Sequence, residues 1–151
     1  MSLERTLVLV KPDGVQRGLA GEVLGRLEGR GLKLVALKLM KMTDAIADQH
    51  YEAHVDKPFF PGLKAFMTSS PIVAAVFEGP DAVRAARAAM GATDPLDAVA
   101  GTIRGDLGLN IGRNVVHSSD SPQAAERETK IFFSPEELLT WERDAERWIV
   151  E

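Results

Sequence analysis

Four short apolar runs, each ended by proline, glycine or a polar cluster, constrain the fold of this 151-residue chain more than any other feature. The first run, residues 6–10, reads Thr-Leu-Val-Leu-Val and stops at Lys11-Pro12. A continuous run of this length is typical of a strand that is covered on both faces. Similar runs occupy residues 32–42, 71–77 and 114–117. The pattern predicts four strands.

Helical segments alternate with these strands. Apolar residues recur at helical spacing over residues 19–27, and Gly31 stands where a helix C-cap is expected. Further helices are predicted at residues 43–54, in a short hairpin up to 70, at 81–90, at 122–130 after a Ser121-Pro122 cap, and from about 134. This order predicts an α/β chain of the α+β kind, a split β-α-β layout with helices on a four-stranded antiparallel sheet. The length fits a single domain, residues 1–151.

Composition excludes several classes of protein. The net charge is −4 and no basic stripe is visible, so the sequence predicts no nucleic-acid partner. No apolar run approaches the roughly 20 residues of a membrane helix, and the N-terminus lacks a signal-peptide layout, so we expect a cytoplasmic protein away from membranes. Because the chain has no cysteine, a metal would need histidine, carboxylate or phosphate ligands.

Common nucleotide and hydrolase motifs are missing. The chain contains no Walker phosphate loop and no G-x-G-x-x-G after a strand. It also lacks the G-x-S-x-G elbow of serine hydrolases. If the protein handles nucleotides, it does so by another route.

His117 is the strongest candidate for chemistry. It ends the apolar run 114–117 and is followed by Ser118-Ser119-Asp120-Ser121, a row of groups able to orient an imidazole. Histidine has an unperturbed pKa of about 6.5, so it can act as a base or nucleophile at neutral pH. Alternation along the strand places His117 and Ser119 on the same side. The alternative is a core histidine that is hydrogen-bonded to the backbone.

The glycine-rich segment 91–113 and the Pro-Phe-Phe-Pro segment 58–61 hold further candidates. Arg104 lies between Gly101 and Gly105, where a guanidinium suits a bidentate oxyanion contact, although a solvated loop charge is the alternative. Arg87, near the end of a predicted helix, could simply complement the helix dipole. Phe59 could pack in the core or stack on a base.

A zinc site is one alternative for His50 and His54. Two histidines four residues apart share a helix face, as metal ligands can. However, Tyr51 stands where the metalloprotease motif has glutamate, and no third ligand is evident. The other interpretation is a helix surface with Tyr51 turned toward a cleft.

Motifs along nearly the whole chain resemble those of the nucleoside diphosphate kinase family. The resemblance rests on the order and spacing of seven segments: Val-Lys-Pro-Asp-Gly at 10–14, His-Tyr at 50–51, Lys-Pro-Phe-Phe-Pro-Gly-Leu at 57–63, Met-Thr-Ser at 67–69, Gly-Ala-Thr-Asp-Pro at 91–95, Gly-Thr-Ile-Arg-Gly-Asp at 101–106 and the residues 114–121 around His117. It implies a ferredoxin-like fold and phosphotransferase activity. The γ-phosphoryl group of a nucleoside triphosphate would pass through a phosphohistidine at His117 to a different nucleoside diphosphate.

The resemblance also implies roles for individual side chains. His117 would be the nucleophile, Ser119 and Glu128 would orient it, and Tyr51 would border the reacting phosphate. Lys11 and Asn114 would bind the sugar hydroxyls, with Lys11 also near the γ-phosphate. The phosphates would be held by Arg87, Thr93 and Arg104, and the base would stack on Phe59 opposite Leu63 and Ile111. Magnesium, Mg2+, would bridge the phosphates with few direct protein ligands. Stacking tolerates any base, so broad base specificity is expected.

The sequence departs from the family pattern at four positions, none of them catalytic. Asp94 stands where Asn is usual, Ala100 where Pro is usual, and Ser70 and Ser118 each replace a Gly. Asp94 and Ala100 lie in the loop that makes subunit contacts in the family. Family members with a tail like residues 138–151 tend to be hexamers, so a homohexamer is expected rather than a tetramer. A nucleotide-binding module without chemistry is the second hypothesis for this fold.

Overall fold

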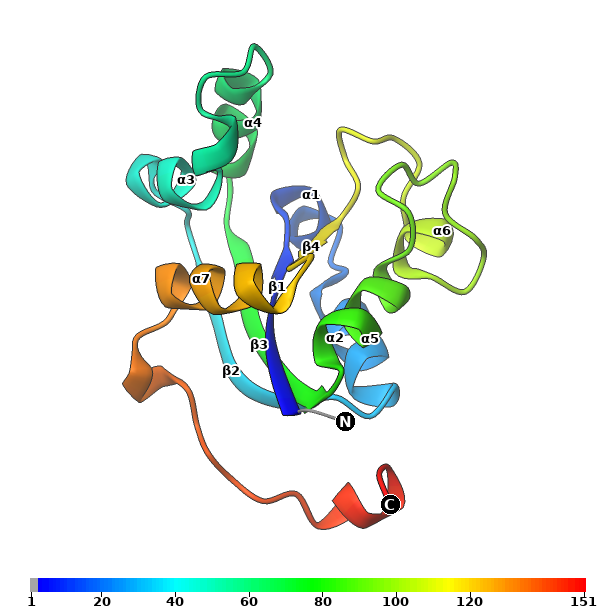
Figure 1. Ribbon diagram of the computed structural model, residues 1–151. Coiled ribbons are helices and arrows are strands. Elements are labelled where there is room, and N and C mark those ends of the chain that lie inside the picture. The colour runs from blue at the N-terminus through cyan, green and yellow to red at the C-terminus, as the bar shows by residue number, and fades with distance from the viewer. Residues whose placement is uncertain (1–2) are drawn as a thin grey trace.

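A four-stranded antiparallel sheet is the centre of the computed structural model, which describes residues 3–151. The strands are β1 (Leu3–Val10), β2 (Lys33–Met40), β3 (Ile72–Pro80) and β4 (Val116–Ser118). They lie in the order β2-β3-β1-β4, with β1 antiparallel to both β3 and β4. Figure 1 shows helices on both faces of the sheet. This is the ferredoxin-like α+β arrangement, so the predicted fold class is confirmed.

One face of the sheet is covered by the two helices that cross between strands. Helix α2 (Ala20–Gly29) comes between β1 and β2, after the short helix α1 (Pro12–Gln16), and α5 (Ala82–Met90) comes between β3 and β4. Val23 and Leu27 of α2 join Val8 and Val10 of β1 in one buried cluster. The alternating side chains of β1 therefore send residues 8 and 10 to this face.

The opposite face is covered by α3 (Asp44–His50), α4 (Phe60–Met67) and α7 (Pro122–Phe132). Leu7 and Leu9 of β1 pack here with side chains from all three helices. Helix α7 begins as predicted, since the Ser121 side chain accepts a hydrogen bond from the backbone N–H of Ala124. With apolar packing on both faces, β1 has the continuous apolar run that the sequence shows.

The helix predicted to run to about residue 54 ends earlier. Thr43 caps α3 by accepting a hydrogen bond from the Ile46 N–H, but the helix stops at His50. Tyr51 leaves the helical conformation, and a separate 3-10 turn follows at Glu52–His54. The His50 ring packs edge to face against His117 and Phe132, with ring centroids 4.8 and 5.3 Å apart. This tertiary packing overrides the local helical signal.

Two boundaries near the glycine-rich segment also differ from the prediction. The segment 91–113 holds a short helix, α6 (Ile103–Leu107), which is capped by the Thr102 side chain. Only one turn long, it carries too little periodicity to detect in the sequence. The fourth strand begins at Val116 rather than at residue 114, because Val115 has a backbone φ of 74° that no strand allows.

The C-terminal segment runs in a mostly extended form past the edge strand β2 and below the sheet in the view of Figure 1. The helix predicted from about residue 134 is only a 3-10 turn, Pro135–Glu137, and a second 3-10 turn spans Asp144–Trp148. Between them the Leu139 N–H donates to the Val35 carbonyl, and Trp141 Nε1 donates to the Leu34 carbonyl. Strand β2 therefore anchors this segment. Among residues 3–151, no helix has the length and apolarity that crossing a membrane requires.

Candidate active site

His117 lies in β4 and faces helix α7. Its Nε2 is 2.8 Å from Oε1 of Glu128, a residue of α7 that is only 6% exposed. An ionised carboxylate can only accept hydrogen bonds, so Nε2 carries the proton and Nδ1 keeps its lone pair. The His117 side chain is 23% exposed, so the ring is reachable from solvent. The alternative of a sealed core histidine is therefore excluded.

Ser119 reaches His117 only through Glu128. The Ser119 hydroxyl donates to Glu128 Oε1 over 3.0 Å, the same oxygen that faces the imidazole. Burial raises the pKa of Glu128, but the hydrogen bond and charge of His117 and the hydroxyl of Ser119 outweigh it. The pKa of Glu128 is therefore below its ordinary value, and the group is a carboxylate at neutral pH.

His50 and Tyr51, at the end of α3, form the wall behind His117. The rings of His50 and His117 meet edge to face with centroids 4.8 Å apart. His50 is 5% exposed, which corrects the interpretation of this helix face as surface. Burial, and then the neighbouring His117, lower the pKa of His50 to about 3, so this ring is neutral. Burial, and then Glu128, raise the pKa of Tyr51 well above its usual range.

Lys11 and Asn114 are joined at the end of β1. Lys11 Nζ donates to Asn114 Oδ1 over 2.9 Å, and Asn114 Nδ2 donates to the Thr93 carbonyl over 3.1 Å. Burial, and then the charge of Arg104, lower the pKa of Lys11 to about 8, while Asp13 opposes the shift. Three residues that the sequence placed in the site are thus brought together by contact.

Arg104 is a buried part of the scaffold, contrary to the alternative of a solvated loop charge. It is 4% exposed and donates to three backbone carbonyls, those of Gly91, Asn114 and Val116. Burial, and then the charge of Arg87, lower its pKa to about 10. Arg87 itself donates to the Ser118 carbonyl over 3.1 Å. Both guanidinium groups therefore hold the backbone on either side of His117.

The backbone turn before His117 depends on Asp13, a residue that the sequence analysis did not assign. Asp13 Oδ2 accepts a hydrogen bond from the N–H of Val115, and the Val115 carbonyl accepts one from the N–H of Lys11. Val115 is fully buried and β-branched, yet its φ is 74°. Such a conformation is strained and persists only where surrounding contacts fix it. The Pro-Asp-Gly sequence directly after β1 was the available signal.

The apolar residues predicted to hold the base lie farther out. Phe59, just before α4, is 54% exposed and Ile111 is 56% exposed, while Leu63 is half-buried. Phe59 contacts the ring of His54 with centroids 5.5 Å apart. Figure 1 shows the α3–α4 hairpin and the loop around α6 rising on either side of α1 and β4. The segments that carry Phe59 and Ile111 therefore lie on either side of the end of the sheet at which His117 lies.

The histidine pair predicted as an alternative zinc site does not form. His50 lies with His117 and Glu128, whereas His54 belongs to the next turn and packs on Phe59. A hydrolase site built on His50 and His54 is therefore not supported.

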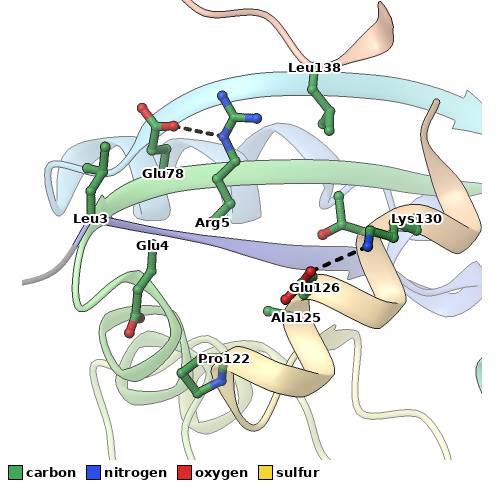
Figure 2. Close-up of a pocket in the computed structure, with 10 residues that line it drawn as sticks. Leu3, Glu4, Arg5, Glu78, Pro122, Ala125, Glu126, Lys130 and Leu138 are labelled. Atoms are coloured by element: carbon green, nitrogen blue, oxygen red, sulfur yellow. Dashed lines mark hydrogen bonds and ion pairs between the residues drawn. The ribbon is translucent and has the colours of Figure 1, made fainter. Parts of the chain in front are cut away.

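A hollow of about 460 Å³ lies between β1 and α7, and none of the predicted site residues lines it. Figure 2 shows its charged side chains pairing among themselves, Arg5 with Glu78 and Lys130 with Glu126. Leu3, Pro122, Ala125 and Leu138 supply its apolar walls. With its cations already neutralised, this hollow is a poor phosphate site, and the candidate active site is the one around His117.

Comparisons with known proteins agree with this geometry. The nucleoside diphosphate kinase family model matches residues 4–138. A nucleoside diphosphate kinase of Archaeoglobus fulgidus is 56% identical over 149 residues, which cover 99% of each chain. The enzyme of Saccharomyces cerevisiae is 55% identical over 148 residues, 98% of this chain and 97% of its own.

Solved structures give the same result. The nucleoside diphosphate kinase of Halobacterium salinarum, solved in complex with CDP, is 53% identical and superimposes with a TM-score of 0.97 over 99% of this chain and 100% of its own. A family protein from Babesia bovis is 48% identical, with a TM-score of 0.95 over 97% of this chain and 99% of its own. The chain therefore belongs to the nucleoside diphosphate kinase family, a family of phosphotransferases.

Proposed function

We propose that this chain moves the γ-phosphoryl group of a nucleoside triphosphate to a different nucleoside diphosphate, and that His117 carries the group in between. The observation that supports this most is the Glu128 contact at Nε2, which leaves the Nδ1 lone pair of a solvent-reachable ring free. Neutral imidazole is a good nucleophile near pH 7. Membership of the family supports the reaction, and the CDP bound to the Halobacterium salinarum enzyme supports a nucleotide as the ligand.

In the first half-reaction, Nδ1 of His117 attacks the γ-phosphorus. The nitrogen–phosphorus bond forms, the bond from phosphorus to the bridging oxygen breaks, and the diphosphate leaves with that electron pair. The ring then carries a positive charge, because Nε2 keeps its proton. The Glu128 carboxylate, 2.8 Å away, neutralises that charge.

In the second half-reaction, a terminal phosphate oxygen of another diphosphate attacks the same phosphorus. The nitrogen–phosphorus bond breaks and its electron pair returns to Nδ1, so the resting ring is restored. Splitting the transfer into two displacements lets one pocket serve donor and acceptor in turn. Phosphoryl transfer needs mainly positioning and charge neutralisation from the protein.

Charge neutralisation falls to Lys11, Arg87 and Arg104. The Arg104 guanidinium has five N–H groups. Three hydrogen bonds to backbone carbonyls engage some of these groups, and the others remain free to donate to a phosphate. The Tyr51 hydroxyl is buried without a hydrogen-bond partner among residues 3–151, and a phosphate oxygen would supply one. Such an orphaned donor beside the nucleophile fits an anionic ligand.

Magnesium fits as part of the substrate. Mg2+ prefers oxygen ligands, and the carboxylate beside His117, that of Glu128, is already engaged by His117 and Ser119. Of the other groups proposed to hold the phosphates, Lys11, Arg87 and Arg104 are cations, which repel a metal, and Thr93 is neutral. We therefore assign Mg2+ to the phosphate oxygens of the bound nucleotide, where it lowers the charge that the protein must neutralise.

Base specificity and assembly of this chain are proposed by extension from the family. Phe59 is proposed to stack on the base, with Leu63 and Ile111 opposite, and this supports broad base specificity. Homohexamer formation is supported by large apolar side chains that are solvent-exposed in a single chain and that contacts between subunits would bury. These include Leu96, Val99, Leu109 and Trp148. A cytoplasmic location stays a prediction.

Exchange of a labelled phosphate tests the proposed function. The chain is incubated with magnesium and ATP labelled at the γ-phosphate. A base-stable, acid-labile label is expected on the protein, and added CDP should remove it as labelled CTP. A chain that binds ATP but acquires no label would contradict the proposal and would indicate a nucleotide-binding module.

The pH dependence of nucleotide binding tests the role of Lys11. Its pKa of about 8 means that this lysine loses its charge as pH rises through 8, whereas an ordinary lysine stays charged. The Kd for ADP is expected to rise above pH 8 by up to about tenfold per pH unit, measured by calorimetry between pH 7 and 9.5. Lys11→Arg should flatten the profile, because arginine keeps its charge. A wild-type profile that is flat over this range would contradict the assignment.

A further inference from the structure

Three ligand-bearing side chains meet beside the proposed nucleophile. His50 ends α3, His117 lies in β4 and Glu128 lies in α7, so three separate elements each supply one. One ligand atom from each residue lies within 4.8 Å of the other two. His50 and Glu128 are buried, at 5% and 6% exposure. Phosphoryl transfer as proposed above uses His117 and Glu128 and gives His50 no chemical role.

The composition of this cluster suits a borderline-soft metal rather than magnesium. Two imidazoles and one carboxylate, with the remaining position open, form a ligand set found in catalytic zinc sites. Magnesium instead requires a shell of oxygens. We propose that His50, His117 and Glu128 bind a divalent transition metal such as Zn2+, and that the bound metal competes with phosphorylation of His117.

The cluster needs little movement to reach metal-binding geometry. Ligand atoms of a tetrahedral zinc site stand about 3.3 Å apart, given metal–ligand bonds of about 2.0–2.1 Å. The His117–Glu128 pair is at 2.8 Å, and the widest separation is 4.8 Å. Closing the gap by about 1.5 Å is within reach of a rotation of the His50 side chain.

One nitrogen of His50 is buried without a partner among residues 3–151, so no hydrogen bond at that atom opposes the rotation. Nδ1 of His50 has no hydrogen-bond partner among residues 3–151, although it is shielded from solvent. Buried polar atoms are normally satisfied, so an unpaired one needs an explanation. No protein hydrogen bond from Nδ1 is lost when the ring turns, and neither tautomer is fixed by that atom. A metal ion would satisfy the ring.

The surroundings support metal binding at this position. Ser119 donates to Glu128, and such a partner fixes the orientation of a ligating carboxylate. Phe132 and Tyr51 lie edge-on to His50 at 5.3 and 4.6 Å between centroids, which gives an apolar outer shell. When zinc binds Nε2 of His117, the ring proton moves through solvent from Nε2 to Nδ1, so the imidazole stays neutral and the freed Nε2 lone pair forms the nitrogen–zinc bond.

Zinc binding and phosphorylation compete because both need a lone pair of the same His117 ring. With zinc on Nε2, the proton of the His117 ring is on Nδ1, so Nδ1 has no lone pair with which to attack phosphorus. Conversely, a phosphorylated ring is cationic and keeps its Nε2 proton, so it excludes the metal. By linkage, bound zinc lowers the equilibrium constant for phosphorylation of His117 by the same factor by which phosphorylation lowers the affinity for zinc.

Direct binding tests the site without any assay of transfer. The full-length chain is stripped of metal and dialysed against zinc chloride, and zinc is then counted by mass spectrometry. We expect one ion per chain, and Co2+ in place of Zn2+ should give the intense visible absorption of a four-coordinate site. His50→Leu should weaken binding at least about a hundredfold, and His54→Leu, the matched control one turn further along, should leave it unchanged.

The outcomes separate the two parts of the proposal. No stoichiometric zinc, or equal affinity in wild type and His50→Leu, overturns the site. If His50→Leu does not fold, His117→Ala serves as the second test, because it removes a ligand that is more exposed. The His117→Ala variant must then fail to bind zinc. One equivalent of zinc should also slow labelling of the wild-type chain by γ-labelled ATP. Binding without that slowing overturns the competition, whereas loss of all labelling in metal-free protein bears on the proposed function alone.

Discussion

Replacing His117 with alanine is expected to lower phosphoryl transfer by at least about four orders of magnitude, because no other group can take the covalent role. Glu128 and Ser119 remain in the variant but have no nucleophile to orient. Nucleotide binding should change far less, since Lys11, Arg87 and Arg104 hold the phosphates in the proposal. The measurement is the steady-state rate of transfer from ATP to CDP, together with the acid-labile label.

The matched control is His54→Ala, the loss of another partly accessible histidine of the same chain. His54 packs on Phe59 and makes no ring contact with His117, so the control should keep the label and alter at most the KM for nucleotides. Both variants should melt as cooperatively as the wild type, because neither side chain belongs to the two buried apolar clusters. Retention of more than about 1% of the wild-type rate in His117→Ala would assign the chemistry to another group.

The fold was predictable from the sequence because both faces of β1 are buried. A strand in that position must be apolar throughout, and residues 6–10 show it directly. The capped start of α7 was equally visible, since Ser121-Pro122 is a local signal. Elements stabilised by distant contacts were not visible. The end of α3 depends on the packing of His50 against His117 and Phe132, and the tail depends on bonds to β2.

Individual residues of the candidate site could be predicted only where they belong to a recognisable sequence motif. His117, Glu128 and Ser119 do meet, as do Lys11, Asn114 and Thr93. The sequence could not reveal what Asp13 does, because its contact to Val115 spans 102 positions. Nor could it reveal that His50 turns inward to face His117. Both depend on tertiary packing that no local pattern encodes.

The contact of Asp13 with Val115 belongs to a larger arrangement that positions β4. Val115 is held in a strained conformation, which is fixed by its hydrogen bonds to Lys11 and Asp13 and by those of its neighbours Asn114 and Val116 to Arg104. Strain at a site persists when the surroundings over-determine it. The turn at Val115 therefore sets how β4 enters the sheet, and with it where His117 stands relative to Glu128. Arg104 is the side chain on which most of that arrangement depends.

Arg104→Met is expected to lower the free energy of unfolding by about 3 kcal/mol, because it leaves three buried carbonyls without their charged donor. The shift in the urea midpoint measures the loss, at one fixed protein concentration because assembly would change the apparent stability. The matched control is Arg84→Met. The Arg84 side chain is 86% exposed and its nearest carboxylate, Asp81, is 3.6 Å away, so a change within about 0.5 kcal/mol is expected.

Arg104→Lys separates the scaffold from the charge. An ammonium group keeps the charge but cannot reach three carbonyls that a planar guanidinium spans, so stability should recover only in part. If Arg104 acts on His117 through the turn at Val115, labelling of His117 should be slow in both variants even at saturating ATP. If it acts only by holding phosphate, the lysine variant should reach the wild-type labelling rate once ATP is saturating. Equal urea midpoints for Arg104→Met and Arg84→Met would contradict the scaffold role, since an exposed and a buried arginine would then contribute alike.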